Sequence, residues 1–271
     1  MLMHPEILDV VRRALNEDIG TGDVTSLACI PADRRATGVF LARQPLVLAG
    51  VDLLKLIYDH ELSILEHDGA ALEDGARIAT VEDNARTLLA YERVALNFLQ
   101  RLSGVATLAR QFASAVEGTG CRVLDTRKTT PGLRRLEKAA AAAGGITNHR
   151  MGLFDAILIK NNHIAAAGGV RRALENASKS GLPIEIEVRS LDELREALDC
   201  GATHLLLDNL SPAQAAEWIG IVNRRATVEL SGRIDLTNVR SYAETGADYV
   251  SSGTITHSAK AVDISFRLEL L

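Results

Sequence analysis

The second half of the chain alternates short apolar segments with amphipathic ones, a pattern that predicts repeated strand–helix units. The last four apolar segments begin roughly 20 residues apart, about one βα unit with short loops. Strands joined by helices run parallel, and a parallel sheet is covered on both faces. The expected strands are 122–124, 156–159, 184–188, 204–207, 227–230 and 249–250, and the expected helices are 133–143, 169–179, 191–199, 213–222 and 236–245.

The first half mixes strands and helices without regular alternation, which predicts an α+β domain. Apolar residues at helical spacing predict a first helix at 5–16, and Asp68-Gly69 and Asp74-Gly75 predict turns. Gly104 is expected to end one long helix before a second one begins. The remaining expectations are a polar loop at 17–26, strands at 37–43 and 46–49, a helix at 51–58, short apolar segments over 61–80, and helices at 84–102 and up to 116.

Polar and charged residues stand at the C-terminal end of nearly every expected strand of the second half. Such side chains converge if the strands close around an axis, as in a barrel whose active site lies at the C-terminal face. Since six strands are fewer than eight, we expect an α/β fold with an incomplete parallel barrel over 105–261. An N-terminal α+β domain is expected over 1–104, with the tail at 262–271 packed on it. An open doubly wound sheet is the alternative, because its sites also lie at carboxyl ends of strands.

Composition narrows the class of protein. The 271 residues are 47% hydrophobic and 24% charged, as in soluble globular proteins. The formal net charge is −5, whereas nucleic-acid-binding proteins usually carry a basic excess. Three widely spaced cysteines, the absence of a recognisable secretory signal and the lack of a long apolar run predict a cytoplasmic protein. We therefore expect no nucleic-acid or membrane partner.

Cationic residues gather around the first two expected barrel strands. Arg127 and Lys128 follow the first strand, and His149 and Arg150 precede the second. Lys160 directly follows an apolar strand, which places it at the expected mouth of the barrel. A single arginine is more often a solvated surface charge, but several cations at one cleft suit an anion with several carboxylates or phosphates.

Two carboxylates and two small turns complete the candidate site. Glu187 and Asp208 end neighbouring strands, where they could pair with lysines, hold Mg²⁺ with substrate phosphates, or stabilise positive charge on a sugar carbon. Ser231-Gly232 and Ser252-Gly253 follow the last two strands, after which barrels often bind a phosphate, and His257 could add a donor. The residues alone predict an enzyme acting on a phosphorylated sugar and an anionic co-substrate.

Several longer stretches resemble one family, quinolinate phosphoribosyltransferase, also called nicotinate-nucleotide pyrophosphorylase (carboxylating). The stretches DTRKTTPGLRRLEK at 125–138 and NHRMGLFDAILIKNNH at 148–163 are long enough to be highly specific. Further similar stretches are 91–107, 207–209 and 242–265. With the loop EDIGTGDVTS at 17–26, the resemblance covers nearly the whole chain.

The resemblance implies a pentosyltransferase of NAD biosynthesis. It would convert quinolinate and 5-phosphoribosyl 1-diphosphate to nicotinate mononucleotide, diphosphate and CO₂ with Mg²⁺, as a homodimer or higher homo-oligomer with shared active sites. The implied quinolinate residues are Arg127, His149, Arg150 and Lys160, with Arg93 reaching the site of the other subunit. The implied ribosyl diphosphate residues are Lys128, Glu187, Asp208, Ser231, Gly232, Gly253 and His257. Lys128, Lys160, Glu187 and Asp208 would be catalytic, and Glu187 and Asp208 would hold Mg²⁺ directly or through water.

The sequence departs from the family pattern at three positions. Asn161 stands where the family usually has Asp, and Ile146 and Arg233 stand where it usually has Gly. Three other readings stay open at this point: a phosphoribosyltransferase of the same fold acting on nicotinate, a barrel enzyme using Lys160 as a Schiff base, and a non-catalytic binding relative. The surplus of cations argues against a ring with one carboxylate.

Overall fold

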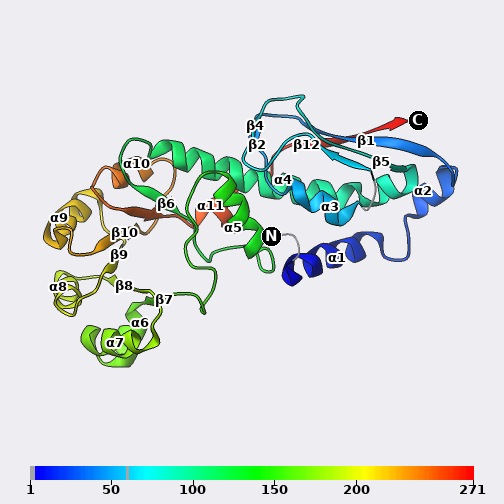
Figure 1. Cartoon of the computed structure of the whole chain (residues 1–271). Coiled ribbons are helices and arrows are strands. Elements are labelled where there is room, and N and C mark those ends of the chain that lie inside the picture. Colours follow the sequence, from blue (N-terminus) through cyan, green and yellow to red (C-terminus); the bar gives the residue numbers. More distant parts are fainter. Residues whose placement is uncertain (1–3, 59–60) are drawn as a thin grey trace. The chain divides into compact units, whose positions relative to one another are not determined.

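The computed structural model describes residues 4–58 and 61–271, so the first residues, where we expect no secretory signal, lie partly outside it. The chain forms two compact units (Figure 1). We call Met1–Arg110, Thr130–Gly145 and Ser258–Leu271 the antiparallel unit, and Gln111–Thr129 and Ile146–His257 the parallel unit. The expected boundary at residues 104 and 105 falls inside one helix, α4 (Ala85–Ala115).

The antiparallel unit is built on a four-stranded sheet in the order β12-β1-β5-β3. Strand β1 (Arg35–Ala42) lies between β5 (Arg77–Asn84) and β12 (Ile264–Leu270), and β3 (Leu62–Ile64) pairs with β5. The rings of Phe40 on β1 and Phe266 on β12 lie opposite each other with centroids 4.9 Å apart. A separate pair, β2 (Leu46–Val47) and β4 (Ala71–Leu72), forms a small two-stranded sheet.

Helices of this unit differ from expectation near residue 20 and residue 53. The polar loop expected over 17–26 is wrong, because α1 (Pro5–Ile19) continues into it and α2 (Val24–Cys29) begins within it. The Asp23 carboxylate caps α2 by accepting hydrogen bonds from the Thr25 and Ser26 amides, both at 3.0 Å. The helix expected over 51–58 is divided into a 3₁₀ turn, η1 (Val51–Leu53), and α3 (Leu54–Ile57).

Gly104 does not end a helix, which corrects the sequence expectation. Helix α4 runs unbroken through it. A Cβ atom at this position would lie 2.1 Å from the Lys260 carbonyl oxygen. The glycine therefore permits close approach of the C-terminal backbone to α4, a role that local sequence does not reveal.

The parallel unit contains a six-stranded sheet in the order β6-β11-β10-β9-β8-β7, with parallel register between neighbours. All six strands lie within a residue or two of their expected positions. Helices α6 (Asn161–Ala167) and α11 (Thr254–His257) were not expected, and α10 (Val239–Ala243) is shorter than expected. The remaining elements are β6 (Arg122–Leu124), β7 (Ile157–Ile159), β8 (Ile184–Val188), β9 (His204–Asp208), β10 (Thr227–Ser231), β11 (Tyr249–Ser251), α7 (Val170–Ala177), η2 (Ser178–Ser180), α8 (Leu191–Asp199) and α9 (Pro212–Val222), with α5 (Arg134–Ala143) in the antiparallel unit.

The parallel sheet curves and does not close. Carboxylates from β8 and β10, two strands separated by β9, both reach the imidazole of His149, so the sheet must bend around that side chain. Strands β6 and β7 form the two edges of the sheet. The expected fold class, an incomplete parallel α/β barrel with an α+β unit, is confirmed. Among the described residues, no helix combines the length and the apolar character needed to cross a membrane.

Candidate active site at the carboxyl ends of the parallel strands

Most of the candidate residues lie where the parallel strands end, because each apolar strand passes directly into a polar loop. The candidates in this unit are Arg127 and Lys128 after β6, His149 and Arg150 before β7, Lys160 after β7, Glu187 on β8, Asp208 on β9, Ser231 and Gly232 at the end of β10, and Gly253 and His257 after β11. The contacts below define two groups. The arginine-rich group is Arg127, Arg150 and Lys160, and the glycine-rich group is Lys128, Gly253 and His257.

Asp125 organises the loop that carries His149, and sequence reasoning did not select it as a site residue. Its side chain is fully buried. One carboxylate oxygen accepts a hydrogen bond from the Asn148 amide side chain at 2.7 Å, and the other accepts from the His149 backbone N–H at 2.8 Å. Asp125 thus fixes residues 148 and 149 against the end of β6. Its position directly after an apolar strand was the available signal.

Arg127 and Arg150 lie close enough to repel each other. Arg150 is partly buried, and its Nη1 donates to the Ala156 carbonyl at 3.0 Å. Burial, followed by the charge of Arg127, lowers the pKa of the Arg150 guanidinium. Two guanidinium groups whose charges act on each other in a partly desolvated place attract an anion with more than one negative group.

Lys160 contacts Glu187, and Glu187 also contacts Arg189. Lys160 Nζ lies 3.1 Å from Glu187 Oε2, and Arg189 Nη2 lies 2.9 Å from Glu187 Oε1. Glu187 is buried, whereas the Lys160 side chain is 49% exposed. Glu187 therefore holds a lysine at the mouth of the barrel while its charge is balanced by two cations. Arg189 was not expected at the site.

Lys128, Gly253 and His257 form the glycine-rich group. A Cβ atom at Gly253 would lie 2.7 Å from Lys128 Cδ and 3.0 Å from His257 Cδ2, so only glycine fits there without displacement. The Thr256 hydroxyl donates to the Lys128 carbonyl at 2.7 Å, which ties the loop after β6 to α11. Two exposed side chains, one cationic and one potentially cationic, thereby converge beside a buried glycine.

The turn after β10 packs against the end of β9. A Cβ atom at Gly232 would lie 2.6 Å from the Asn209 backbone nitrogen, and Gly232 has a φ of 108°. The Asn209 N–H donates to the Ser231 carbonyl at 2.9 Å. Arg233, one of the departures from the family pattern, adopts a left-handed φ of 52°, which is unfavourable for a residue with a Cβ.

Asp208 and Glu187 have the oxygen donors that Mg²⁺ prefers. Asp208, the last residue of β9, is partly exposed and accepts a hydrogen bond from the Asn209 side chain at 2.5 Å. Glu187 is already paired with Lys160 and Arg189. Because Mg²⁺ usually keeps several waters and takes one or two carboxylates plus substrate phosphates, these two carboxylates would suit such an ion.

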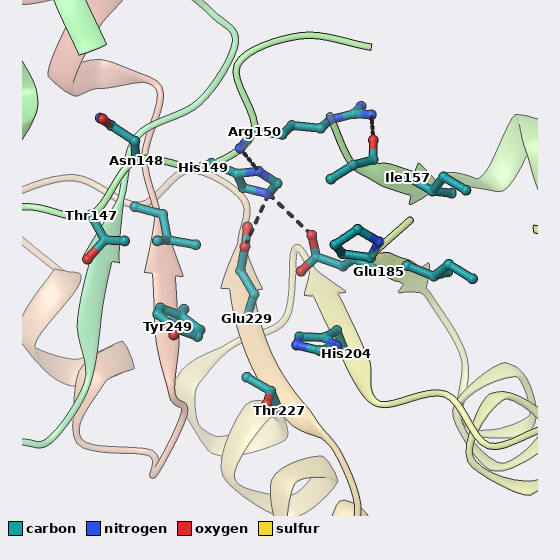
Figure 2. Close-up of a pocket in the computed structure, with 14 residues that line it drawn as sticks. Thr147, Asn148, His149, Arg150, Ile157, Glu185, His204, Thr227, Glu229 and Tyr249 are labelled. Carbon is teal, nitrogen blue, oxygen red and sulfur yellow. Dashed lines mark hydrogen bonds and ion pairs between the residues drawn. The ribbon is translucent and has the colours of Figure 1, made fainter. Parts of the chain in front are cut away.

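His149 lies between two carboxyl groups, Glu185 on β8 and Glu229 on β10 (Figure 2). Its Nε2 is 3.2 Å from Glu185 Oε2 and 3.4 Å from Glu229 Oε2. These residues line a cavity of about 240 Å³ that extends along the inner face of the sheet to His204, Thr227 and Tyr249. Among the described residues, this is the one cluster of three potential metal ligands. Glu185 and Glu229 were not expected in the site.

Arg93 lies in the antiparallel unit, on α4. Its side chain is 56% exposed, and Nη2 lies 3.4 Å from the carboxylate of its neighbour Glu92. The contacts described for Arg93 do not include any of the residues above.

Comparison with known proteins identifies the family. The chain matches the models of the quinolinate phosphoribosyl transferase N-terminal domain over residues 23–103 and C-terminal domain over residues 105–267. It is 41% identical to the nicotinate-nucleotide pyrophosphorylase [carboxylating] of Mycobacterium leprae, over 96% of each chain. It is 39% identical to a mitochondrial quinolinate phosphoribosyltransferase [decarboxylating] of Nicotiana tabacum, over 98% of this chain and 84% of that one.

A solved structure agrees with this similarity. The nicotinate-nucleotide pyrophosphorylase from Francisella tularensis superimposes with a TM-score of 0.94 at 37% identity, covering 98% of both chains. Sequence and fold point the same way, and the chain belongs to the quinolinate phosphoribosyltransferase family.

Proposed function

We propose that this protein transfers the phosphoribosyl group of 5-phosphoribosyl 1-diphosphate to quinolinate and releases diphosphate and CO₂. The observation that carries this proposal is the proximity of the Arg127 and Arg150 charges near the end of the parallel sheet, where the charge of Arg127 lowers the pKa of Arg150. Quinolinate carries two adjacent carboxylates, and two neighbouring arginines match a dianion better than a ring with one carboxylate.

The arginine-rich group is the proposed quinolinate subsite. Arg127 and Arg150 bind the carboxylates, and Lys160 adds a third cation at the barrel mouth, held by Glu187. The His149 ring accepts a hydrogen bond from the Arg150 backbone N–H beside this subsite. The surplus of positive charge orients the dianion with its ring nitrogen towards the second substrate, which is mainly a positioning task.

The glycine-rich group, together with the turn at Ser231 and Gly232, is the proposed phosphoribosyl subsite. Ser231, Gly232, Gly253 and His257 surround the 5-phosphate, because glycine allows the phosphate to approach the backbone. Lys128 neutralises the departing diphosphate. Asp208 and Glu187 would hold Mg²⁺, directly or through water, and the ion would supply positive charge for the diphosphate.

The reaction then needs little covalent chemistry from the protein. The bond between C1′ and the diphosphate oxygen breaks, and the electron pair leaves with the diphosphate. Carboxylates such as Asp208 stabilise the positive charge that develops on the ribosyl carbon. The ring nitrogen donates its lone pair to C1′ and becomes a cation. The bond from C2 to its carboxylate breaks, CO₂ leaves, and C2 retains the electron pair and accepts a proton from water.

We further propose a homodimer in which Arg93 completes the site of the other subunit. The support is its half-exposed side chain on α4, together with the resemblance of the surrounding stretch 91–107 to the family. In such a two-fold dimer each contact occurs twice, giving two composite sites. All three cysteines are free thiols, which fits a reducing compartment such as the cytoplasm.

The decisive experiment measures release of ¹⁴CO₂ from quinolinate labelled at the 2-carboxylate, with purified protein, 5-phosphoribosyl 1-diphosphate and Mg²⁺. We expect CO₂ and nicotinate mononucleotide in equal amounts, dependent on both substrates, and no nucleotide from nicotinate. Product from nicotinate at a comparable kcat/KM would favour the phosphoribosyltransferase with a one-carboxylate substrate. Binding of quinolinate without turnover would favour a non-catalytic relative.

A further inference from the structure

The family resemblance assigns His149 to quinolinate, but both nitrogens of its ring contact the protein. The Arg150 backbone N–H donates to Nδ1 at 2.6 Å, and Nε2 faces the carboxyl groups of Glu185 and Glu229 at 3.2 and 3.4 Å. Figure 2 shows the ring spanning these groups while the Arg150 guanidinium extends away from it. This bridge connects β8 and β10 to the residue that carries the proposed carboxylate-binding guanidinium.

We propose that Glu185 and Glu229 are positioning residues: they hold His149 as the neutral tautomer with its proton on Nε2, and His149 in turn fixes the backbone of Arg150 in the quinolinate subsite. The proposal deepens the proposed function and rests on it for the identity of the substrate. Its structural part, the tautomer and its hydrogen bonds, stands independently of which substrate is turned over.

The backbone amide of Arg150 decides the tautomer. An N–H group can donate only to a ring nitrogen that lacks a proton, so Nδ1 must be unprotonated. A neutral imidazole then has its proton on Nε2, and that proton is directed at the two carboxyl groups. An imidazolium ion is disfavoured, because its Nδ1 proton would face the amide proton of Arg150 between two nitrogen atoms only 2.6 Å apart.

Protonation of Glu229 explains how two carboxyl groups can lie beside a neutral imidazole. Glu229 is almost fully buried and near Glu185, so two anions here would face each other with little water between them. Burial, then the charge of Glu185, raises the pKa of Glu229 to about 8, against smaller opposing effects of His149 and a hydrogen bond from Ser251. A protonated Glu229 can therefore remain beside Glu185 and one neutral imidazole.

The same amide argues against a metal ion at this cluster, although its three side chains have the right atoms. A histidine that binds a metal through Nε2 normally donates its Nδ1 proton to an acceptor. Here Nδ1 faces a donor instead. The role that fits every contact is orientation of the ring.

The first test is ¹⁵N NMR of histidine-labelled protein, with the His149 signal identified by its loss in His149→Gln. We expect one protonated and one unprotonated ring nitrogen, with the proton on Nε2, from about pH 6 to 8. The same pattern should persist in Glu229→Gln, whose amide keeps a polar neutral partner, and after addition of Zn²⁺. Two protonated nitrogens, a proton on Nδ1, or loss of the Nε2 proton with Zn²⁺ would overturn the proposal.

The second test separates positioning from general folding by kinetics. Glu229→Leu removes the polar partner, and we expect its KM for quinolinate to rise roughly ten- to a hundred-fold, the effect of a small misplacement, while the KM for 5-phosphoribosyl 1-diphosphate is unchanged. Glu229→Gln should stay near wild type. Glu217→Leu, at an exposed carboxylate on α9, is the matched control. Equal rises in both KM values, or no rise in a folded Glu229→Leu, would refute the positioning role. If the protein proves to turn over no quinolinate, the proposed function fails and the NMR result still decides the tautomer.

Discussion

Lys160 Nζ lies 3.1 Å from Glu187 Oε2, so one ion pair joins the proposed quinolinate subsite to the proposed phosphoribosyl subsite. The pair gives the lysine a fixed place at the barrel mouth. The pair also reduces the repulsion between Glu187 and a dianionic substrate, because the charge of Glu187 is balanced partly by Lys160 and partly by Arg189. The first two predictions follow from this division of charge.

Replacing Asp208 should affect turnover and not quinolinate binding. Asp208→Asn removes a negative charge that would repel the dianion and that the developing ribosyl cation needs. We expect kcat to fall by about 10²-fold, the usual effect of losing one electrostatic group in an active site. Calorimetry should show quinolinate affinity equal to or tighter than that of wild type. Weaker quinolinate binding with normal kcat at saturation would reverse the assignment of Asp208.

Replacing Arg150 should have the opposite effect. Arg150→Ala leaves one carboxylate of quinolinate without its cationic partner, so the free energy of quinolinate binding should weaken by roughly 2–5 kcal/mol. Titration calorimetry with quinolinate measures this directly. Arg195→Ala, at an exposed arginine on α8, is the matched control and should bind normally. An unchanged dissociation constant for Arg150→Ala would remove Arg150 from the subsite.

A mixing experiment tests whether Arg93 serves the other subunit. Arg93→Ala and Lys160→Ala should each be nearly inactive. In a mixed dimer one site collects both substitutions and the other collects neither. Random one-to-one mixing makes about half of the dimers mixed, so activity should return to about a quarter of wild type. If mixed dimers form, as shown by mass spectrometry with one tagged chain, and activity stays absent, Arg93 does not act across the interface.

The ion pair of Arg101 and Glu137 predicts a stability effect separate from catalysis. Glu137 is fully buried and accepts hydrogen bonds from Arg101 Nη2 at 2.7 Å and from the Thr130 amide at 3.0 Å. Arg101→Ala would leave a buried carboxylate without its cation, which costs about 3–5 kcal/mol. Urea unfolding should show this loss, with Arg13→Ala at an exposed pair as control. A loss below about 1 kcal/mol would mean that water replaces the arginine.

Glu229 predicts how stability depends on pH. Its pKa in the folded protein is raised to about 8, above its ordinary value of 4.5. Between these values the unfolded chain has lost the proton that the folded protein still holds. The free energy of unfolding should therefore be highest below about pH 4.5 with respect to this group and fall as pH rises towards 8, by on the order of 1 kcal/mol per pH unit. Glu229→Gln should remove this contribution, so a pH dependence identical to wild type would contradict the raised pKa.

The strand ends were predictable because each strand is an apolar run that stops at a charged residue, as at Ile159 and Lys160. The buried carboxylates that contact His149 were harder to predict. Glu185 and Glu187 are two residues apart and share one face of β8. An acidic residue within a strand is usually solvated, so the sequence did not mark Glu185 as a site residue. Only the curvature of the sheet brings Glu185 to His149. The prediction that Gly104 ends a helix was wrong, because this glycine is needed for close approach of the Lys260 carbonyl, a contact with a segment distant in sequence. Contacts between distant segments were therefore the part that local pattern could not supply.

The pairing of β12 with β1 has a consequence for biosynthesis. Strand β1 is among the first to leave the ribosome, whereas β12 is translated after every strand of the parallel sheet. Until then one edge of β1 exposes unpaired N–H and carbonyl groups, a surface that other chains can join. At about 5–20 residues per second, the nascent protein spends many seconds in that state. The antiparallel unit thus starts first and is completed last, and one edge of β1 stays open to other chains for most of translation.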